Sequence, residues 1–125
     1  MLIRPDLLLR LEALFVLCAA LLCYSVLHGS WLLFAVLFFV PDLPLLGYVA
    51  KIDGRIAAML YNFTHCYAVP SAVGLIVWNL HAVRGEQLAA IWIAHIAFDR
   101  TVGAGLKYPQ VFRPTHIQMT RFYRP

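Results

Sequence analysis

Four long apolar segments, separated by short polar linkers, decide what this chain can fold into. The segments cover residues 11–28, 31–49, 56–79 and 86–106, and each falls within the ~17–25 residues that a membrane-spanning helix needs. The linkers HGS, KIDGR and AVRGE are short enough to join antiparallel neighbours. The sequence therefore predicts an all-α fold, an integral membrane four-helix bundle with up-down topology.

The composition agrees with lipid-facing surfaces. Of all residues, 62% are hydrophobic and 13% are charged, whereas soluble domains are closer to half apolar and a quarter charged. The first segment, preceded by Arg4 and Arg10, is also similar to a cleaved signal peptide. We expect it to be retained as the first helix, because apolar sequence resumes at once with WLLFAVLFFV.

The positions of lysine and arginine predict the orientation. If the N-terminus is cytoplasmic, only Arg84 lies on the far side, and the cations that share the cytoplasmic side are Arg4, Arg10, Lys51, Arg55, Lys107, Arg113, Arg121 and Arg124. This asymmetry is typical of multi-pass membrane proteins and predicts that both termini are cytoplasmic. We expect a transmembrane domain over residues 1–106 and a basic cytoplasmic tail over residues 107–125.

The tail mixes cations with aromatic residues in KYPQVFRPTHIQMTRFYRP. This mixture suits an anionic lipid surface, where each cation contributes on the order of 1 kcal/mol. No nucleic-acid-binding motif accompanies it elsewhere. We therefore expect membrane lipid as a partner and no nucleic acid, with protein partners or a homo-oligomer left open.

Prolines interrupt two of the apolar segments. Pro41 and Pro44 remove backbone donors, so the second segment is expected to kink or restart there. Asp42 would then lie near the start of the new piece, at the positive end of its helix dipole. Pro70 is expected to bend the third segment one turn after His65. The second and third helices are thus predicted to be kinked.

Several ionisable side chains lie inside the apolar segments, where each costs roughly 2.5–3.5 kcal/mol on insertion scales. Counted at ~1.5 Å per residue, Asp42, His65, His95 and Asp99 all fall in the cytoplasmic half at similar depths. His95 and Asp99 are four positions apart, so they share one helix face. The pattern predicts that these groups from three segments converge.

Two imidazoles and two carboxylates suit a divalent metal, with Zn–N and Zn–O bonds of ~2.0–2.2 Å, and the ion would neutralise the buried carboxylates. Two alternatives stay open from the residues alone. Asp99 can pair with Arg100 or Arg10 while the histidines bind Asn62, Thr64 or backbone carbonyls, as in the polar networks that join membrane helices. A haem held by both histidines is the other alternative, although the two carboxylates disfavour it.

Three motifs, in the order VPDLPLLG (40–47), YNFTHCY (61–67) and AHIAFDRTVGAG (94–105), resemble those of the inner-membrane-associated metal-dependent hydrolases of bacteria. That family looks distantly related to the zinc-dependent phospholipases C. The resemblance covers roughly residues 40–105. It implies that Asp42, His65, His95 and Asp99 hold a metal ion. Where the family has an N-terminal His, this chain has Glu12, which implies Glu12 as a ligand of a second metal bridged by Asp99.

The chain departs from that family at several positions. Pro44 replaces the second Asp of the first motif, whose His is absent here. Tyr61, Asn62 and Phe63 replace the His-Arg-Gly of the second motif. A leaner site than the family's is therefore expected, with Asn62 as a possible additional site residue.

The whole chain is also similar to a family of small bacterial membrane proteins known only as a domain of unknown function. The shared features are RLE, VPDL, YN-x-x-H, AHI-x-FDR and GLKYP followed by TH. This resemblance extends into the tail and adds His116 as a candidate site residue. It implies a bacterial inner-membrane protein and gives no activity.

The leading functional hypothesis is a membrane-embedded metal-dependent hydrolase that acts on a lipid or phosphoester near the cytoplasmic leaflet, with zinc as the expected ion. Asp99 and Arg100 are the catalytic candidates, the arginine by stabilising developing anionic charge. The alternative is a non-catalytic accessory or interaction subunit whose buried His/Asp network is structural. A small ion conduit, which would need an oligomer, is a third possibility.

Overall fold

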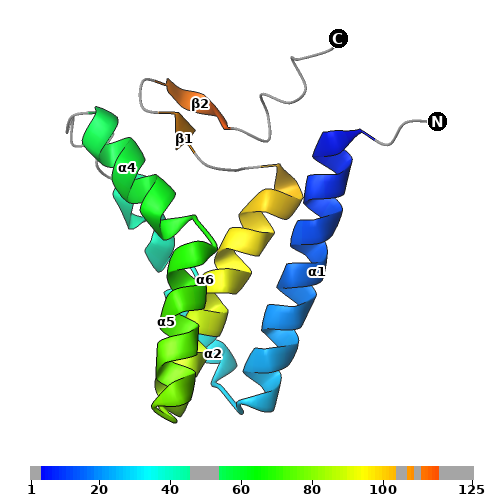
Figure 1. Ribbon diagram of the computed structural model, residues 1–125, viewed down its shortest axis with the longest axis vertical. Coiled ribbons are helices and arrows are strands. Elements are labelled where there is room, and N and C mark those ends of the chain that lie inside the picture. Colours follow the sequence, from blue (N-terminus) through cyan, green and yellow to red (C-terminus); the bar gives the residue numbers. More distant parts are fainter. Residues whose placement is uncertain (1–3, 46–53, 104–106, 109–110, 116–125) are drawn as a thin grey trace.

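The computed structural model describes residues 4–45, 54–103, 107–108 and 111–115. Within these ranges the chain is helical apart from one short hairpin, which confirms the predicted helical class. Helices α1 (Pro5–Val26), α5 (Ala68–Asn79) and α6 (Val83–Val102) lie along the long axis of the molecule (Figure 1). Helices α1 and α6 run in opposite directions and pack against each other along much of their length.

Helix α1 begins at Pro5, whose fixed φ and missing N–H suit the first helical position. Asp6 in the first turn pairs with Arg4, with a distance of 3.1 Å between Arg4 Nε and Asp6 Oδ1. In the described part of the chain, α1 is the one helix that is long and apolar enough to cross a membrane. The multi-pass topology and the location of the termini therefore stay predictions.

The second apolar segment forms two short helices, which corrects the prediction of one kinked helix. Helix α2 (Trp31–Leu37) begins after Ser30, whose hydroxyl accepts a hydrogen bond from the Leu33 N–H. The 3-10 helix η1 (Val40–Leu45) follows, with Asp42 in its first turn. The restart expected at Pro41 is present, because proline cannot donate the hydrogen bond that would continue α2. Residues 46–49 of this segment lie outside the described residues.

The third segment is also divided, and its break lies before the predicted position. Helix α4 (Gly54–Thr64) ends before a turn at His65–Tyr67, and α5 begins at Ala68. Pro70 lies in the first turn of α5, where its missing N–H breaks no hydrogen bond within the helix. The expected bend at Pro70 is therefore wrong. The actual break places His65 at the end of α4.

Small side chains fill the contacts between the helices. The buried residues are rich in alanine, including Ala13 and Ala20 of α1 and Ala94 and Ala97 of α6. Small residues let helix backbones approach closely, as they do in membranes. Gly74 of α5 has the same role, because an added Cβ would contact the Ala89 side chain of α6 at 3.6 Å.

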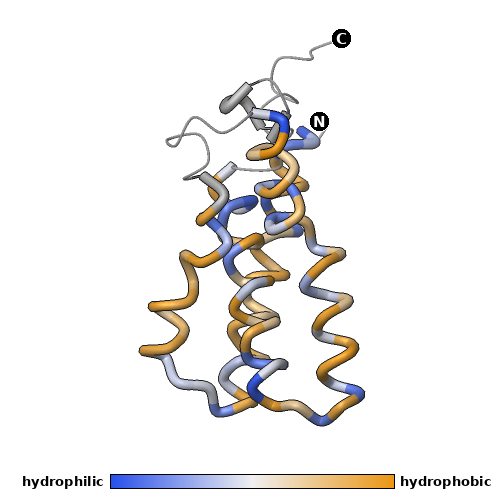
Figure 2. Tube along the Cα trace, turned by 90° about the vertical axis from the view of Figure 1, so that its left-hand side faces the viewer, coloured by the Kyte–Doolittle hydropathy of each residue, from blue (hydrophilic) through white to orange (hydrophobic). Residues whose placement is uncertain are grey.

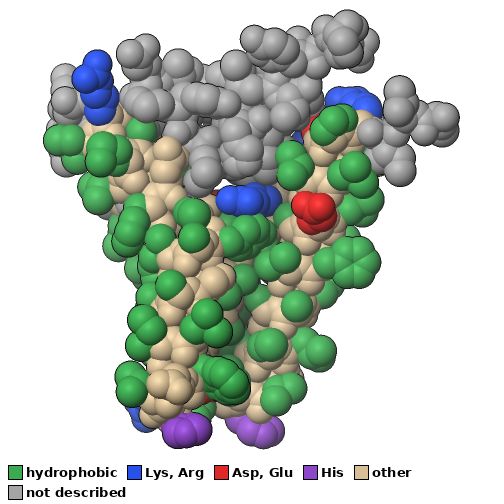
Figure 3. All heavy atoms as spheres, viewed as in Figure 1, with side chains coloured by type: hydrophobic (Ala, Val, Ile, Leu, Met, Phe, Trp, Pro, Cys, Tyr) green, Lys and Arg blue, Asp and Glu red, His purple; other side chains and the backbone are tan. Residues whose placement is uncertain are grey.

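Large apolar side chains lie on the outside. Phe15, Leu32 and Val26 are each at least 70% exposed. Figure 2 shows apolar residues along most of the helices, with hydrophilic residues at the turns that join them. Figure 3 shows hydrophobic side chains over the visible faces of α1 and α5, with few charged groups among them. This distribution is the reverse of the usual arrangement in a soluble domain.

Helix α6 ends at Val102 and is capped by Gly103, which has a left-handed conformation with φ of 98°. Glycine is the usual residue there because it carries no Cβ. Beyond it, β1 (Lys107–Tyr108) pairs with β2 (Val111–Thr115) in an antiparallel hairpin. The hairpin lies at the same end of the molecule as the start of α1 (Figure 1). No strand was expected in the tail, whose alternation of polar and apolar residues is too short to indicate one.

Candidate metal centre

Four side chains from three elements converge beside the break between α4 and α5. Asp42 comes from η1, His65 follows α4, and His95 and Asp99 lie on α6. Asp42 Oδ1 lies 3.1 Å from Nε2 of each histidine. Asp99 Oδ2 lies 3.2 Å from the same two nitrogens. The structure thus brings together the four residues that sequence depth and spacing single out.

The separations fit the ligand atoms of one metal ion. The two Nε2 atoms of His65 and His95 lie 3.1 Å apart, and all four donor atoms lie within 4.8 Å of one another. Donors bound to one ion at ~2.0–2.2 Å lie roughly 3–3.5 Å from their neighbours. Two imidazoles and two carboxylates form a donor set that suits zinc and other divalent transition metals.

The backbone fixes the tautomer of His65. Its Nδ1 lies 2.9 Å from the carbonyl oxygen of Tyr61. A carbonyl oxygen only accepts, so Nδ1 carries the proton and donates it. The Tyr61 ring also stacks on the imidazole, with centroids 3.8 Å apart and planes 9° apart. In the neutral ring, the lone pair of Nε2 then faces the carboxylates of Asp42 and Asp99.

This arrangement requires a positive charge at its centre. Lone pairs and carboxylate oxygens repel one another unless a proton or a cation lies among them. Two protons can offset both carboxylates, one on the Nε2 of each histidine and each donated to a carboxylate oxygen, which makes both rings imidazolium. A divalent cation offsets both carboxylates and leaves the histidines neutral, the form in which imidazole binds metals.

Burial differs between the two halves of the group. The side chains of His65 and His95 are 3% and 1% exposed, whereas those of Asp42 and Asp99 are 33% and 18% exposed. The histidines therefore form the floor of the centre. Access from outside is on the carboxylate side, at Asp42.

Neighbouring side chains hold the three elements in register. Thr64 Oγ1 donates to the carbonyl oxygen of Pro41, at 3.0 Å, which ties the end of α4 to η1. Trp92 Nε1 of α6 donates to the carbonyl oxygen of Thr64, at 2.6 Å. The ring of Phe38 meets the edge of the His95 ring at 5.0 Å. His95 Nδ1 has no hydrogen-bond partner among the described residues, so the Phe38 ring and the Nε2 contacts to Asp42 and Asp99 orient the imidazole.

Sequence reasoning did not identify Thr64, Trp92 or Phe38 as supports of the site. The sequence indicates Thr64 only as a hydrogen-bond partner of the histidines, and its Oγ1 does lie 3.0 Å from His65 Nδ1. Trp92 and His95 are three positions apart on α6, which is the one sequence signal that links them. The contacts of Phe38 depend on the break after α2 and have no local signal.

Two of the other predicted site residues lie away from the four-residue group. Arg100 donates from its NH2 to the carbonyl oxygen of His65, at 3.4 Å, and its guanidinium lies 4.3 Å over the Tyr67 ring. Glu12 lines a separate cavity of about 110 Å³ together with Tyr67 and Arg100. Successive residues of a helix point about 100° apart, so Arg100 cannot share the direction of Asp99.

The other two predicted site residues, Asn62 and His116, supply none of the four donor atoms in the described part of the chain. The carbonyl oxygen of Asn62 accepts a hydrogen bond from the His65 N–H, at 3.3 Å, but its side chain is not among the four donors. His116 lies outside the described residues. The metal-binding roles of Glu12, Asn62 and His116 therefore stay predictions.

Comparisons with known proteins give a family and no activity. No curated protein and no solved structure matches the chain. The resemblance to metal-dependent hydrolases thus gains no support from them. A family model described as a domain of unknown function (DUF4260) matches residues 6–120. The chain belongs to the DUF4260 family.

Proposed function

We propose that this protein is a membrane-embedded metal-dependent hydrolase that acts on a lipid ester or phosphoester near the cytoplasmic leaflet. The observation that carries the proposal is the convergence of two histidine Nε2 atoms and two carboxylate oxygens, with each N–O separation 3.1–3.2 Å. Such a cluster is costly to keep in an apolar bundle without a cation. A divalent ion, zinc by its donor set, is the cofactor that we infer.

The surface supports a location in the membrane. Large apolar side chains cover the outside, and alanines fill the helix contacts. Arg4 and Arg55 are exposed at the end that carries the hairpin, and Arg84 is exposed at the start of α6, near the opposite end. This bias agrees with cytoplasmic termini under the positive-inside rule. The bacterial inner membrane is the compartment that the sequence resemblance favours.

The residues of the centre have separate tasks in this proposal. When bound, a divalent ion supplies Lewis-acid polarisation of the scissile ester or phosphoryl group and lowers the pKa of water. His65 and His95 hold the ion from the buried side. Asp42 is the most exposed of the four, and the oxygen that makes the described contacts is Oδ1. We infer that its other oxygen, Oδ2, would accept a proton from the attacking water.

Arg100 has a positioning task in this proposal, which differs from the sequence prediction of a catalytic group. Its hydrogen bond to the His65 carbonyl holds the turn that presents the imidazole. The guanidinium is engaged with this carbonyl and with the Tyr67 ring and is not among the four donor groups. We therefore infer that Arg100 acts through His65.

The test is turnover in proteoliposomes with a panel of fluorogenic phosphodiester and carboxylic ester lipids, in the presence of zinc or manganese. We expect hydrolysis that is lost in His65→Ala and in His95→Ala and retained in the matched control His81→Asn. His81 lies in the turn after α5 with a positive φ of 53°, a conformation that Asn tolerates. Turnover that both alanine variants retain would contradict the proposal.

A non-catalytic accessory subunit is the second candidate. The observation that favours it is that the four side chains also contact one another at 3.1–3.2 Å, as a hydrogen-bonded network does. Such a network joins membrane helices with ~0.6 kcal/mol per bond on average. This role predicts that His95→Ala lowers thermal stability while the purified protein carries no metal in either form.

A further inference from the structure

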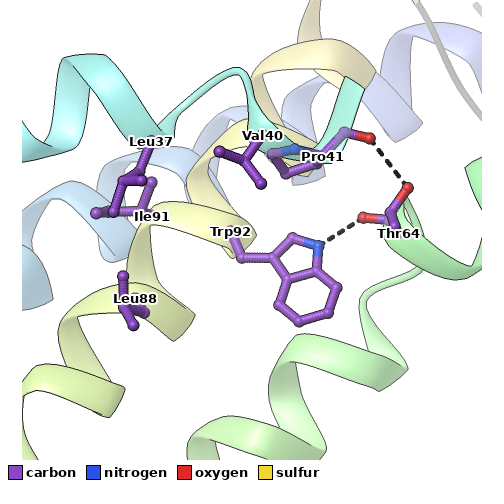
Figure 4. A pocket seen from close by; sticks show the side chains of 7 residues that line it. All are labelled: Leu37, Val40, Pro41, Thr64, Leu88, Ile91 and Trp92. Carbon is purple, nitrogen blue, oxygen red and sulfur yellow. Dashed lines mark hydrogen bonds between the residues drawn. The ribbon is translucent and has the colours of Figure 1, made fainter. Parts of the chain in front are cut away.

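A second feature lies next to the candidate metal centre, namely a cavity of about 270 Å³ between η1, the end of α4 and the middle of α6 (Figure 4). Pro41 and Thr64 line one side of it, and Leu88, Ile91 and Trp92 line the other. Nothing in the sequence reasoning or in the proposed chemistry assigns a use to this cavity.

The walls of the cavity offer no free hydrogen-bonding side chain. Of the side chains that line it, only those of Thr64 and Trp92 carry a polar group. Trp92 Nε1 donates to the Thr64 carbonyl, and Thr64 Oγ1 donates to the Pro41 carbonyl (Figure 4). Polar groups of an occupant would therefore be left without partners, at a cost of about 1–3 kcal/mol each. The occupant that fits is a hydrocarbon.

On each of the three elements, residues that line the cavity lie close in sequence to a residue of the metal centre. Pro41 precedes Asp42, and Thr64 precedes His65. On α6, Leu88, Ile91 and His95 follow the i, i+3, i+7 spacing of one helix face. One face of α6 thus borders the apolar cavity and then the polar centre. An amphiphile has the same arrangement, with a hydrocarbon chain followed by a polar end.

The mouth of the cavity lies on the apolar exterior. Val40 and Leu88, which line it, are 47% and 48% exposed. A chain that leaves a bilayer can therefore enter without crossing a polar surface. The residues of α6 that line the cavity precede His95. In the proposed orientation, the cavity therefore lies deeper in the membrane, measured from the cytoplasmic side, than the metal centre does. A lipid of the cytoplasmic leaflet has its chains on this side of its polar group.

We propose that this cavity binds the alkyl chain of a membrane amphiphile whose polar end lies at the His65–His95 centre. The inference deepens the proposed function, on which the position of the polar end rests. The chain-binding part stands on the cavity alone. The alkyl chain can come from a phospholipid or from a free fatty acid.

Trp92 makes the proposal measurable, because bromine atoms on an alkyl chain quench indole fluorescence on contact. The test uses Trp31→Phe/Trp78→Phe protein, in which Trp92 is the remaining tryptophan, in bilayers of unlabelled lipid. One arm adds a chain-brominated phosphatidylcholine and the other a chain-brominated fatty acid. We expect quenching that saturates at low mole fraction in at least one arm, which identifies the source of the chain.

Two variants in this background separate the cavity from ordinary lipid contact. Leu88→Phe enlarges a half-exposed side chain at the mouth and is expected to remove the saturable component. Leu75→Phe makes the same change at a residue of α5 that is 66% exposed and does not line the cavity, and it should leave the quenching unchanged. Val40→Phe repeats the test from η1 in case Leu88→Phe lowers the yield of folded protein.

Quenching that rises linearly with mole fraction in both arms would overturn the proposal, because that is the behaviour of bulk lipid around an accessible indole. Saturable quenching that persists in both Leu88→Phe and Val40→Phe would also overturn it, since the chain would then lie elsewhere. The readout needs neither metal nor turnover. The saturable quenching should therefore persist in Asp99→Ala even if hydrolysis is absent. This result separates a failure of chain binding in the cavity from a failure of the proposed hydrolysis.

Discussion

The Nε2 atoms of His65 and His95 face each other across 3.1 Å, and each lies within 3.2 Å of the same two carboxylates. Few chemical species suit the centre of such a group. When His65 is neutral, the Tyr61 carbonyl keeps its proton on Nδ1, and the group presents an Nε2 lone pair and two carboxylates to a common point. A divalent cation at that point makes the cluster neutral.

If His95 binds a metal ion, the folded protein should be more stable with the metal than without it. Addition of zinc to metal-stripped protein in detergent should raise its Tm, since a ligand at 100 times its Kd contributes about 2.7 kcal/mol to the free energy of unfolding. His95→Ala should show no such rise, while His81→Asn should behave as the parent. An equal rise in all three proteins, measured by thermal scanning fluorimetry, would assign the effect to ions bound elsewhere.

Thr64 is predicted to support the centre without binding the ion. Thr64→Val removes the hydrogen bond to the Pro41 carbonyl that ties α4 to η1, at a cost of about 1 kcal/mol of unfolding free energy. Thr64 Oγ1 also lies 3.0 Å from Nδ1 of His65, and loss of a contact to a metal ligand typically lowers metal affinity 10–100-fold. Thr101→Val is the control, because its hydroxyl donates within α6 to the Ala97 carbonyl. Metal titration should therefore separate the two variants. Equal affinities would show that Thr64 does not position the ligands.

Two glycines should respond in opposite ways to alanine. Gly103 has φ of 98°, and an added Cβ would meet the guanidinium of Arg10, so Gly103→Ala should cost about 1–3 kcal/mol. An added Cβ at Gly74 meets the Ala89 side chain at an ordinary 3.6 Å. Gly74→Ala should therefore be neutral or stabilise α5 by about 0.5–1 kcal/mol. Thermal unfolding in detergent measures both, and equal destabilisation would contradict this packing.

The orientation in the membrane can be tested with cysteine labelling. In protein whose cysteines at positions 18, 23 and 66 are replaced, an impermeant maleimide added to intact spheroplasts should label Asn79→Cys and not Arg4→Cys. The reason is that the end of α5 is expected outside and the start of α1 inside. Labelling of Arg4→Cys in intact cells would reverse the topology, and labelling of both only after lysis would place the two ends in the cytoplasm.

The convergence of the four central residues was predictable because it depends on quantities that a sequence carries. Depth within an apolar segment places Asp42, His65 and Asp99 at one level, and the i, i+4 spacing places His95 and Asp99 on one face. The direction of the other side chains depends on how each helix is rotated against its neighbours. Glu12 and Arg100 were therefore grouped with the centre, although they line a separate cavity.

The helix boundaries were less predictable for a related reason. Pro70 is a strong helix breaker inside a helix and a good residue in its first turn, and the sequence does not distinguish the two positions. The turn at His65–Tyr67 contains no glycine or proline that would have indicated it. Hydropathy likewise joins α4 to α5 and α2 to η1, because apolar residues continue across both breaks.

The metal content of the purified protein tests the central claim most directly. Elemental mass spectrometry of detergent-purified protein, after reconstitution with excess zinc or manganese and removal of free ion, should give about one ion per chain, as a single four-donor site requires. Asp99→Ala should lose this ion, and Glu12→Ala should keep it. No ion in the parent protein, or equal content in the parent and in Asp99→Ala, would contradict a metal centre at His65 and His95 and favour the structural network.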